Sequence, residues 1–239
     1  MVGSSFFALG DRYYLQARVL PAVLCLLPII VSLYVAVPSL ATMFGTLGGL
    51  VATLALSLLL SRLVRNSGAS KEAGLFRSWG GTPTTILLRH TDSTIDPLTK
   101  QRYHAFLANA VGVSMPSPDA ERADTPAADL LYESCVRRLR EMTRDHKRYP
   151  RVFDENVMYG FSRNLWAIKP WGIVVTACTL ALDAIVTGLD WPSHEPAYAI
   201  LSVSVMAYLL VWVFGISASF VRSAAWAYAR ALLATCEGI

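Results

Sequence analysis

Four long apolar blocks constrain the fold of this 239-residue chain more than any other feature. They cover residues 19–37, 43–63, 171–189 and 197–220. A helix needs about 20 predominantly apolar residues to cross the hydrocarbon core of a bilayer, and each block is about that long. Only 16% of the residues are charged, whereas soluble domains typically contain about a quarter. The sequence therefore predicts four transmembrane helices.

The loops between the blocks predict the orientation in the membrane. Residues 38–42 and 190–196 are short, contain no Lys or Arg, and join the blocks into two helical hairpins. Residues 62–170 contain 17 of the 21 basic side chains, and cytoplasmic loops retain such residues. Both termini and the central stretch are therefore expected in the cytoplasm. The alternative is that the first block is a secretory signal peptide, which would leave an odd number of spans.

The expected fold class is an all-α membrane protein with four transmembrane helices as two hairpins and a helical cytoplasmic domain inserted between them. Its predicted parts are a cytoplasmic N-terminal amphipathic segment (1–18), a first transmembrane hairpin (19–63), a cytoplasmic ligand-sensing domain (64–170), a second transmembrane hairpin (171–220) and a cytoplasmic C-terminal helix (221–239).

Turn-forming and helix-capping residues divide the central domain further. Asp96-Pro97 has the chemistry of a helix start, and that helix is expected to reach about Ala110. A second helix is expected to open at Thr125-Pro126 and to end by Tyr149-Pro150. The remaining expectations are a turn at 66–70, a β-strand at 84–88, a loop at 112–123 and a last helix at 154–166.

The chain lacks common catalytic signatures, and their absence from the sequence argues against an enzyme. The chain has no Gly-x-Ser-x-Gly, no phosphate-binding loop ending in Lys-Ser/Thr and no His-Glu-x-x-His. His90 with Asp92, or His104 with Asp96, could form a metal or general-base pair, but no Cys/His spacing resembles a zinc site. The four cysteines indicate no disulfide framework. We therefore expect no catalytic residue, no metal and no cofactor.

The central domain instead has the composition of an anion-binding domain. Residues 62–170 hold 17 basic and 12 acidic side chains, a balance that favours a phosphate-bearing ligand. The alternative is that Arg89 pairs with Asp92 or with a neighbouring subunit, and that the other residues form a solvated helix face. The residues expected to bind the ligand supply cationic groups, hydroxyls and an aromatic ring that could stack on a base, and they are Thr84, Arg89, His90, Lys100, Arg102, Tyr103, His104 and Arg163.

Asp183 is unusual because a carboxyl group inside an apolar span is costly unless it faces protein or water. It belongs to a polar stripe at helical spacing that could line a pore, consisting of Thr176, Thr179, Asp183 and Thr187. Within one subunit the same stripe could instead hold helices together by hydrogen bonds. Four spans with short loops leave no room for a pore in one chain, so a channel requires a homo-oligomer.

Several motifs resemble those of bacterial membrane effectors of Hailong-type antiphage defence. The motifs are Gly80-Gly81-Thr82-Pro83-Thr84-Thr85, Leu88-Arg89-His90-x-Asp92, Asp96-x-x-Thr99-x-x-Arg102-Tyr103-His104 and Asn156-x-x-Tyr159-Gly160-Phe161-x-Arg163-Asn164-Leu165-Trp166. The resemblance implies a tetrameric ion channel that a single-stranded DNA oligomer, an oligodeoxyadenylate made by a partner nucleotidyltransferase, keeps closed. The residues alone agree equally with a nucleotide second messenger as ligand. They also agree with a non-conducting membrane scaffold that docks a soluble partner or anionic membrane lipid.

Overall fold

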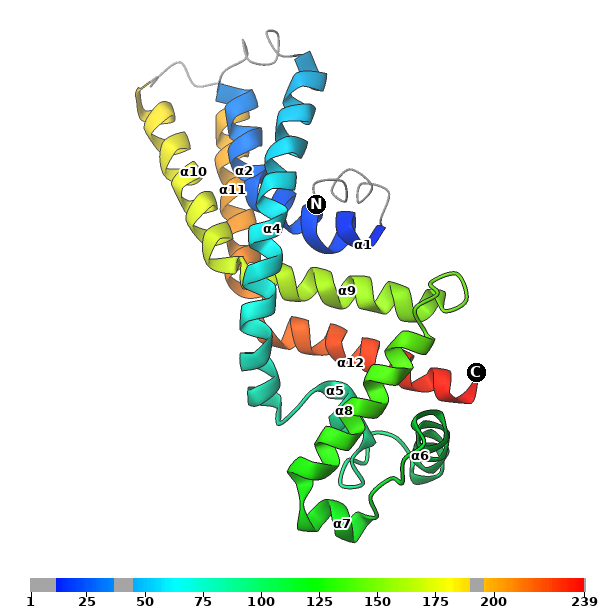
Figure 1. The fold of residues 1–239 in the computed structure, drawn as a ribbon. Helices are drawn as coiled ribbons and strands as arrows, with labels where there is room; N and C mark the ends of the chain where they lie inside the picture. The colour runs from blue at the N-terminus through cyan, green and yellow to red at the C-terminus, as the bar shows by residue number, and fades with distance from the viewer. Residues whose placement is uncertain (1–11, 37–44, 190–195, 239) are drawn as a thin grey trace. The chain divides into compact units, whose positions relative to one another are not determined.

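The computed structural model describes residues 12–36, 45–189 and 196–238, and within them the secondary structure is entirely helical (Figure 1). This confirms the prediction of an all-α protein. Both hairpin loops, apart from Pro196, and residues 1–11 of the predicted amphipathic segment lie outside the described residues.

The chain forms two compact units. Met1–Glu72 and Gly160–Val221 make up the first, which we call the span unit, and Ala73–Tyr159 and Arg222–Ile239 make up the second, the polar unit. The three helices that contribute residues to both units are α4 (Gly45–Trp79), α9 (Pro150–Ala167) and α12 (Ala218–Ala234).

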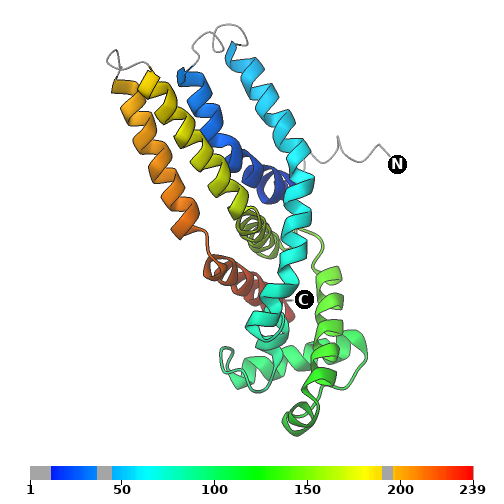
Figure 2. The same ribbon diagram turned by 90° about the vertical axis from the view of Figure 1, so that its left-hand side faces the viewer.

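Among the residues that the structure describes, three helical stretches of the span unit are long and apolar enough to cross a membrane: Arg12–Val35, Lys169–Gly188 and Tyr198–Gly215. The first stretch consists of α1 (Arg12–Tyr14), a π-helical turn η2 (Leu15–Val19) and α2 (Leu20–Ala36). The second is α10 (Lys169–Leu189). The third is α11 (Pro196–Leu210), which continues as the π-helical turn η3 (Val211–Gly215). Helices α2, α10 and α11 pack side by side (Figure 2).

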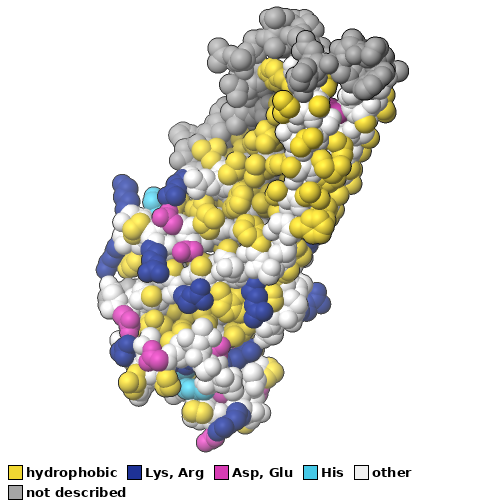
Figure 3. Space-filling view, turned by 180° about the vertical axis from the view of Figure 1, so that it is seen from behind, with side chains coloured by type: hydrophobic (Ala, Val, Ile, Leu, Met, Phe, Trp, Pro, Cys, Tyr) yellow, Lys and Arg dark blue, Asp and Glu magenta, His cyan; other side chains and the backbone are white. Residues whose placement is uncertain are grey.

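The outer surface of the span unit is apolar. Leu33, Ile185, Val203 and Phe214 are exposed, and hydrophobic side chains cover much of the unit in the view from behind (Figure 3). Inside the unit, Trp212 is fully buried and its indole ring packs against Gly172. A Cβ added to Gly172 would lie 2.5 Å from that ring. Exposed apolar side chains on helices of this length suit contact with lipid tails.

Two predicted elements of this unit differ in the structure. The fourth apolar block does not form one helix to residue 220, because the span ends at Gly215 and α12 begins at Ala218, with the Ser217 hydroxyl accepting from the Phe220 amide at 3.3 Å. The turn predicted at 66–70 is wrong, since α4 continues without interruption through these residues. Gly68 serves close packing instead: a Cβ there would lie 2.0 Å from Oδ1 of Asn164. Residues 45–63 of the second apolar block thus form the first part of the long helix α4.

The polar unit contains four capped helices, α5 (Pro83–Leu88), α6 (Pro97–Val111), α7 (Pro118–Ala123) and α8 (Thr125–Met142). The last part of α4, the first part of α9 and most of α12, followed by the 3₁₀ turn η4 (Thr235–Glu237), complete it. Thr82, Asp96, Ser117 and Asp124 each accept a hydrogen bond from the amide three residues later, and helices α5 to α8 all have proline at the start. A cap followed by proline satisfies and preorganises the first helical turn.

These caps explain both the correct and the wrong predictions. The helix from Pro97 is confirmed and ends where Gly112 adopts a left-handed conformation with φ of 74°. The predicted strand at 84–88 is wrong, because Thr82 and Pro83 open α5 there. The loop predicted at 112–123 contains α7, and Tyr149-Pro150 begins α9 rather than ending the preceding helix.

The core of the polar unit lies between α5, α6, α8 and α12. Leu87, Leu107, Tyr132, Leu139 and Leu232 are fully buried in it. The core thus joins residues 83–142 to the C-terminal helix, and the predicted ligand-binding run lies along its edge.

Candidate functional site

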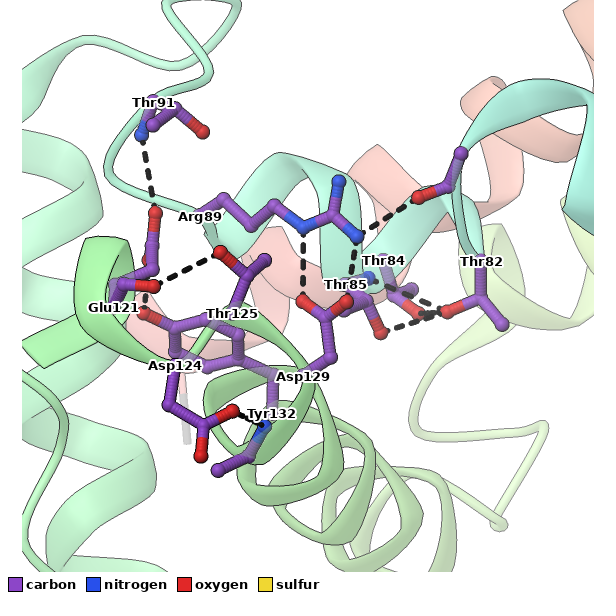
Figure 4. Close-up of polar contacts among 12 residues, drawn as sticks. Thr82, Thr84, Thr85, Arg89, Thr91, Glu121, Asp124, Thr125, Asp129 and Tyr132 are labelled. Atoms are coloured by element: carbon purple, nitrogen blue, oxygen red, sulfur yellow. Dashed lines mark hydrogen bonds and ion pairs between the residues drawn. The ribbon is translucent and has the colours of Figure 1, made fainter.

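Arg89 follows the last residue of α5 and reaches across to α8 (Figure 4). Its Nε and Nη2 donate to the two carboxylate oxygens of Asp129 at 2.8 and 2.6 Å, and Nη2 also donates to the Gly80 carbonyl at 2.8 Å. The hydrogen bonds to Asp129 are the main cause that raises the pKa of Arg89. The partner of Arg89 is therefore Asp129 and not Asp92, the residue considered from the sequence.

Glu121 of α7 is the central acceptor beside this pair (Figure 4). Only 1% of it is exposed, and its carboxylate accepts from the Tyr132 hydroxyl at 2.7 Å and from the amides of His90 and Thr91 at 2.9 and 3.4 Å. Burial acts to raise the pKa of Glu121, but the bonds from Tyr132 and from the two amides outweigh it, so the pKa lies below its usual value. Burial, and after it the same carboxylate, raises the pKa of Tyr132.

Lys100 of α6 holds the other side of the loop. It is 4% exposed, and its Nζ donates to the Arg89 carbonyl at 2.6 Å and to the Asp92 carbonyl, with the Asp92 carboxylate at 3.9 Å. Burial lowers the pKa of Lys100. A buried ammonium group needs such acceptors, because an unpaired one would lose its hydration without compensation.

The two histidines of the run are also engaged. Nε2 of His104 lies 2.8 Å from the Leu88 carbonyl and Nε2 of His90 lies 3.0 Å from the Pro116 carbonyl, so each ring nitrogen donates its proton there. The His104 ring contacts the rings of His90 and Tyr132 at centroid distances of 4.9 and 5.5 Å. Burial lowers the pKa of His104.

The remaining predicted ligand residues of the run lie farther apart. Arg102 is on the exposed side of α6, where it pairs with Glu237 at 2.6 Å and donates to the Thr99 hydroxyl at 2.8 Å. Tyr103 is only 6% exposed, so its ring packs in the core and is not presented to a base. Thr84 is buried, with its hydroxyl 3.3 Å from that of Thr82.

These contacts decide what the run can do chemically. Its cationic groups point at protein acceptors: Arg89 at Asp129, Lys100 at two carbonyls and Arg102 at Glu237. The arrangement fixes the loop after α5 against α6, α7 and α8. A phosphate that bound to Nε or Nη2 of Arg89 or Arg102, or to Nζ of Lys100, would compete with contacts that are already made.

Arg163, the last predicted ligand residue, lies in the span unit. Its Nη1 contacts Glu72 Oε1 at 2.8 Å, while the neighbouring Asn164 donates to the Ala17 carbonyl at 2.6 Å. Ala17 lies in the π-helical turn η2, and π-helical bonding differs from the α-helical pattern in a way that often marks a specialised site. Arg163 and Asn164 therefore join α9 to α4 and to the first span.

Three residues of the predicted pore stripe, Thr176, Thr179 and Asp183, are buried within the span unit, and Thr187 is half-buried. Thr176, Thr179 and Thr187 donate to carbonyls of their own helix, those of Gly172, Val175 and Asp183, at 2.6 to 2.8 Å. Asp183 is 6% exposed and accepts from the Ser32 hydroxyl of α2 at 2.9 Å. The structure thus contains the interhelical hydrogen bond that was the alternative reading, and pore lining stays a prediction.

Sequence reasoning missed Glu121, Asp129 and Tyr132. Ser117-Pro118 followed by two acidic residues is a helix start that could have located α7, but nothing local indicates that Glu121 faces inward. Asp129 lies 40 residues from Arg89, so only the tertiary fold brings the pair together.

The described residues contain no group of three or more His, Cys, Asp or Glu side chains that could hold a metal ion. The chain matches no protein-family model, no curated protein and no solved structure.

Proposed function

We propose that the protein is an oligomeric membrane effector of the ion-channel type, whose polar unit responds to a phosphate-bearing ligand. One observation carries the proposal: α4, α9 and α12 each contribute residues to both units. The polar unit is thus joined to the span unit at three places through helices. A small shift of a helix can transmit a change in one unit to the other, whereas a single flexible linker would serve mainly as a tether.

In this proposal four spans form two hairpins in a bacterial inner membrane, with both termini and the polar unit in the cytoplasm. The absence of Lys and Arg from the two hairpin loops of the sequence supports that orientation. A pore then requires several chains, and a homotetramer follows the resemblance to antiphage-defence effectors. The same resemblance suggests a single-stranded oligodeoxyadenylate, or another nucleotide messenger made by a partner nucleotidyltransferase, as the ligand.

The buried polar stripe indicates how such a channel would open. Since Asp183 is bonded to Ser32, the arrangement described is the non-conducting one in this proposal. Opening would separate α2 from α10 and expose Asp183 and the threonines to water. A ligand at residues 84–104 would act on the loop held by Arg89, Glu121 and Lys100.

Planar-bilayer recording of the purified protein, with and without oligodeoxyadenylate, tests the proposal. We expect conductance that depends on the oligonucleotide, and Asp183→Asn should alter the ion selectivity of the open state because it removes a charge from the pore wall. Ser204→Ala, an exposed hydroxyl on α11, is the matched control and should conduct normally. Absence of conductance in both states would sink the proposal.

The second candidate is a non-conducting membrane scaffold. The burial of Thr176, Thr179 and Asp183 inside one subunit favours it, because hydroxyls that only join helices need no pore. It predicts that Asp183→Asn changes thermal stability and leaves vesicle permeability at the level of protein-free vesicles.

A further inference from the structure

The positive charge of the chain is concentrated in a short segment that the candidate site does not use. Residues 137–151, which we call the basic segment, hold seven basic and two acidic side chains. Residues 62–170 hold 17 basic and 12 acidic side chains, so the part of this stretch outside the basic segment contains ten basic and ten acidic side chains. The entire charge excess of the polar stretch therefore lies in 15 residues. The basic side chains are Arg137, Arg138, Arg140, Arg144, Lys147, Arg148 and Arg151.

All seven side chains are exposed. In α8 the basic residues occupy the face opposite Tyr132, Cys135, Val136 and Leu139, which are buried in the core. The segment continues through a turn in which the Asp145 carboxylate accepts from the amides of Lys147 and Arg148 at 2.9 and 3.4 Å. One of the two acidic residues is thus partly engaged in shaping the turn.

Helix stability does not account for this concentration of charge. Basic residues near the end of α8 suit the helix dipole, but Arg151 lies in the first turn of α9, where a positive charge is unfavourable. The one ion pair that the described structure gives these seven residues is that of Arg144 with Glu141, at 3.5 Å and largely exposed, and such pairs contribute little. A surface of this kind suits an external anion.

We propose that the basic segment docks on anionic phospholipid headgroups of the membrane in which the chain is anchored. Clusters of four to eight Lys and Arg beside a span are typical of this role. The segment is close to a span along the chain, because it ends at Arg151 in the first turn of α9 and only residues 152–168 separate it from the candidate span Lys169–Gly188. The part of α9 between them is about 24 Å long, so the segment can reach the headgroup layer.

A lipid surface fits the segment better than nucleic acid does. Recognition of single strands uses exposed aromatic side chains as stacking platforms. Tyr149, the tyrosine of this segment, packs against the core of the polar unit and is covered by the guanidinium of Arg148, 5.4 Å from the ring centroid. The segment thus offers charge without an open tyrosine, phenylalanine or tryptophan ring. The inference does not depend on whether the spans conduct.

The experiment uses the full chain in lipid nanodiscs of phosphatidylcholine alone or with phosphatidylglycerol. A fluorophore on His146→Cys, in a Cys178→Ala background because Cys178 is the exposed cysteine of the described residues, reports energy transfer to headgroup-labelled lipid. Arg137→Gln, Arg144→Gln and Arg148→Gln together form the test variant. Arg77→Gln, Arg122→Gln and Arg230→Gln, all exposed outside the segment, form the matched control.

We expect stronger energy transfer in discs that contain phosphatidylglycerol, and we expect salt to reverse the increase. The test variant should weaken the docking equilibrium on the order of 100-fold, whereas the control variant should dock as the original chain does. Equal transfer in both lipids, or equal loss in both variants, would overturn the proposal. The proposal would also be overturned if the chain bound a labelled mixed-sequence single-stranded DNA, the test variant abolished that binding, and lipid composition had no effect on energy transfer. Matching unfolding temperatures of the two variants exclude misfolding, since all six positions are exposed.

Discussion

In the polar unit, Glu121 and Lys100 are buried charges that connect segments distant in the sequence, whereas the buried threonines of α10 in the span unit bond mainly to their own helix. Glu121 joins α7 to α8 and to the loop after α5, and Lys100 joins α6 to that loop. Thr176 and Thr179 each donate to the carbonyl four residues earlier. Among the bonds that the structure describes, α10 makes two kinds of polar contact with other segments. Asp183 accepts from Ser32 of α2, and Lys169, at the start of the helix, donates to the carbonyls of Val213 and Ile216.

This difference shows which interactions determine the arrangement of the helices in each unit. A buried carboxylate with three donors fixes one arrangement of the polar unit, because any other would leave a charge or several amides unsatisfied. Helices in a membrane satisfy their backbone internally, so close packing at positions such as Gly172 beneath Trp212 decides their fit. Polar substitutions should therefore be costly in one unit and size substitutions in the other.

Glu121→Ala should have the largest effect. It removes the acceptor of the Tyr132 hydroxyl and of two amides, at an expected cost of about 3 kcal/mol in unfolding free energy. Thermal unfolding of the full chain in detergent, followed by intrinsic fluorescence, measures this as a lowered midpoint. Glu133→Ala, exposed on α8, is the control and should leave the midpoint nearly unchanged. Equal effects of the two would show that Glu121 does not organise the unit.

Gly172→Ala should come next, at about 2 kcal/mol, because the added methyl would lie 2.5 Å from the Trp212 ring and overpack the interface. Gly188→Ala on the same helix is the matched control, since nothing lies within 4 Å of its Cβ position. That control should be neutral or slightly stabilising, because alanine favours helix over glycine. If Gly172→Ala had the same unfolding midpoint as the original chain, close packing at this position would not determine the stability of the span unit.

The sequence was sufficient wherever a signal is local. Asp96-Pro97 marked the start of α6, and long apolar runs marked the three candidate spans, because caps and hydropathy act within a few residues. Thr82-Pro83 carries the same signal as Asp96-Pro97, yet the β-branched residues after it suggested a strand. Six residues are too few for a helical period to outweigh β propensity.

The site could be predicted only in part, because composition does not say which way a side chain faces. The cationic residues of 89–104 were identified, but their acceptors are Asp129, Glu237 and backbone carbonyls. The excess of basic over acidic residues in 62–170 suggested an anion site, and the structure shows that the cationic groups of Arg89 and Lys100 face protein acceptors whereas the basic segment is exposed. That division depends on burial, which a count of residues cannot supply.

Acid should weaken the polar unit through His104. Burial lowers its folded pKa, so on acidification the unfolded chain takes up a proton first, and stability falls as the pH drops below about 6.5. The loss should approach about 1.4 kcal/mol per pH unit. Glu121, whose folded pKa is also lowered, loses its contribution only at lower pH. Unfolding midpoints from pH 7.5 to 5 should show a flatter dependence for His104→Gln, whose amide nitrogen lies near the position of the histidine Nε2 and can donate to the Leu88 carbonyl, than for the exposed control His146→Gln. Equal slopes would assign the acid sensitivity to another group.

Single hydroxyls of the span unit should matter least. Ser32→Ala removes the bond to Asp183 and should cost about 0.6 kcal/mol, the usual worth of a hydrogen bond between membrane helices. Thr179→Val should cost almost nothing, since the hydroxyl bonds to the Val175 carbonyl of its own helix and the shape is kept. Unfolding midpoints in detergent compare the two. If Thr179→Val proved as damaging as Glu121→Ala, the threonine would have to hold α10 to another helix or subunit, and the contrast between the two units would no longer stand.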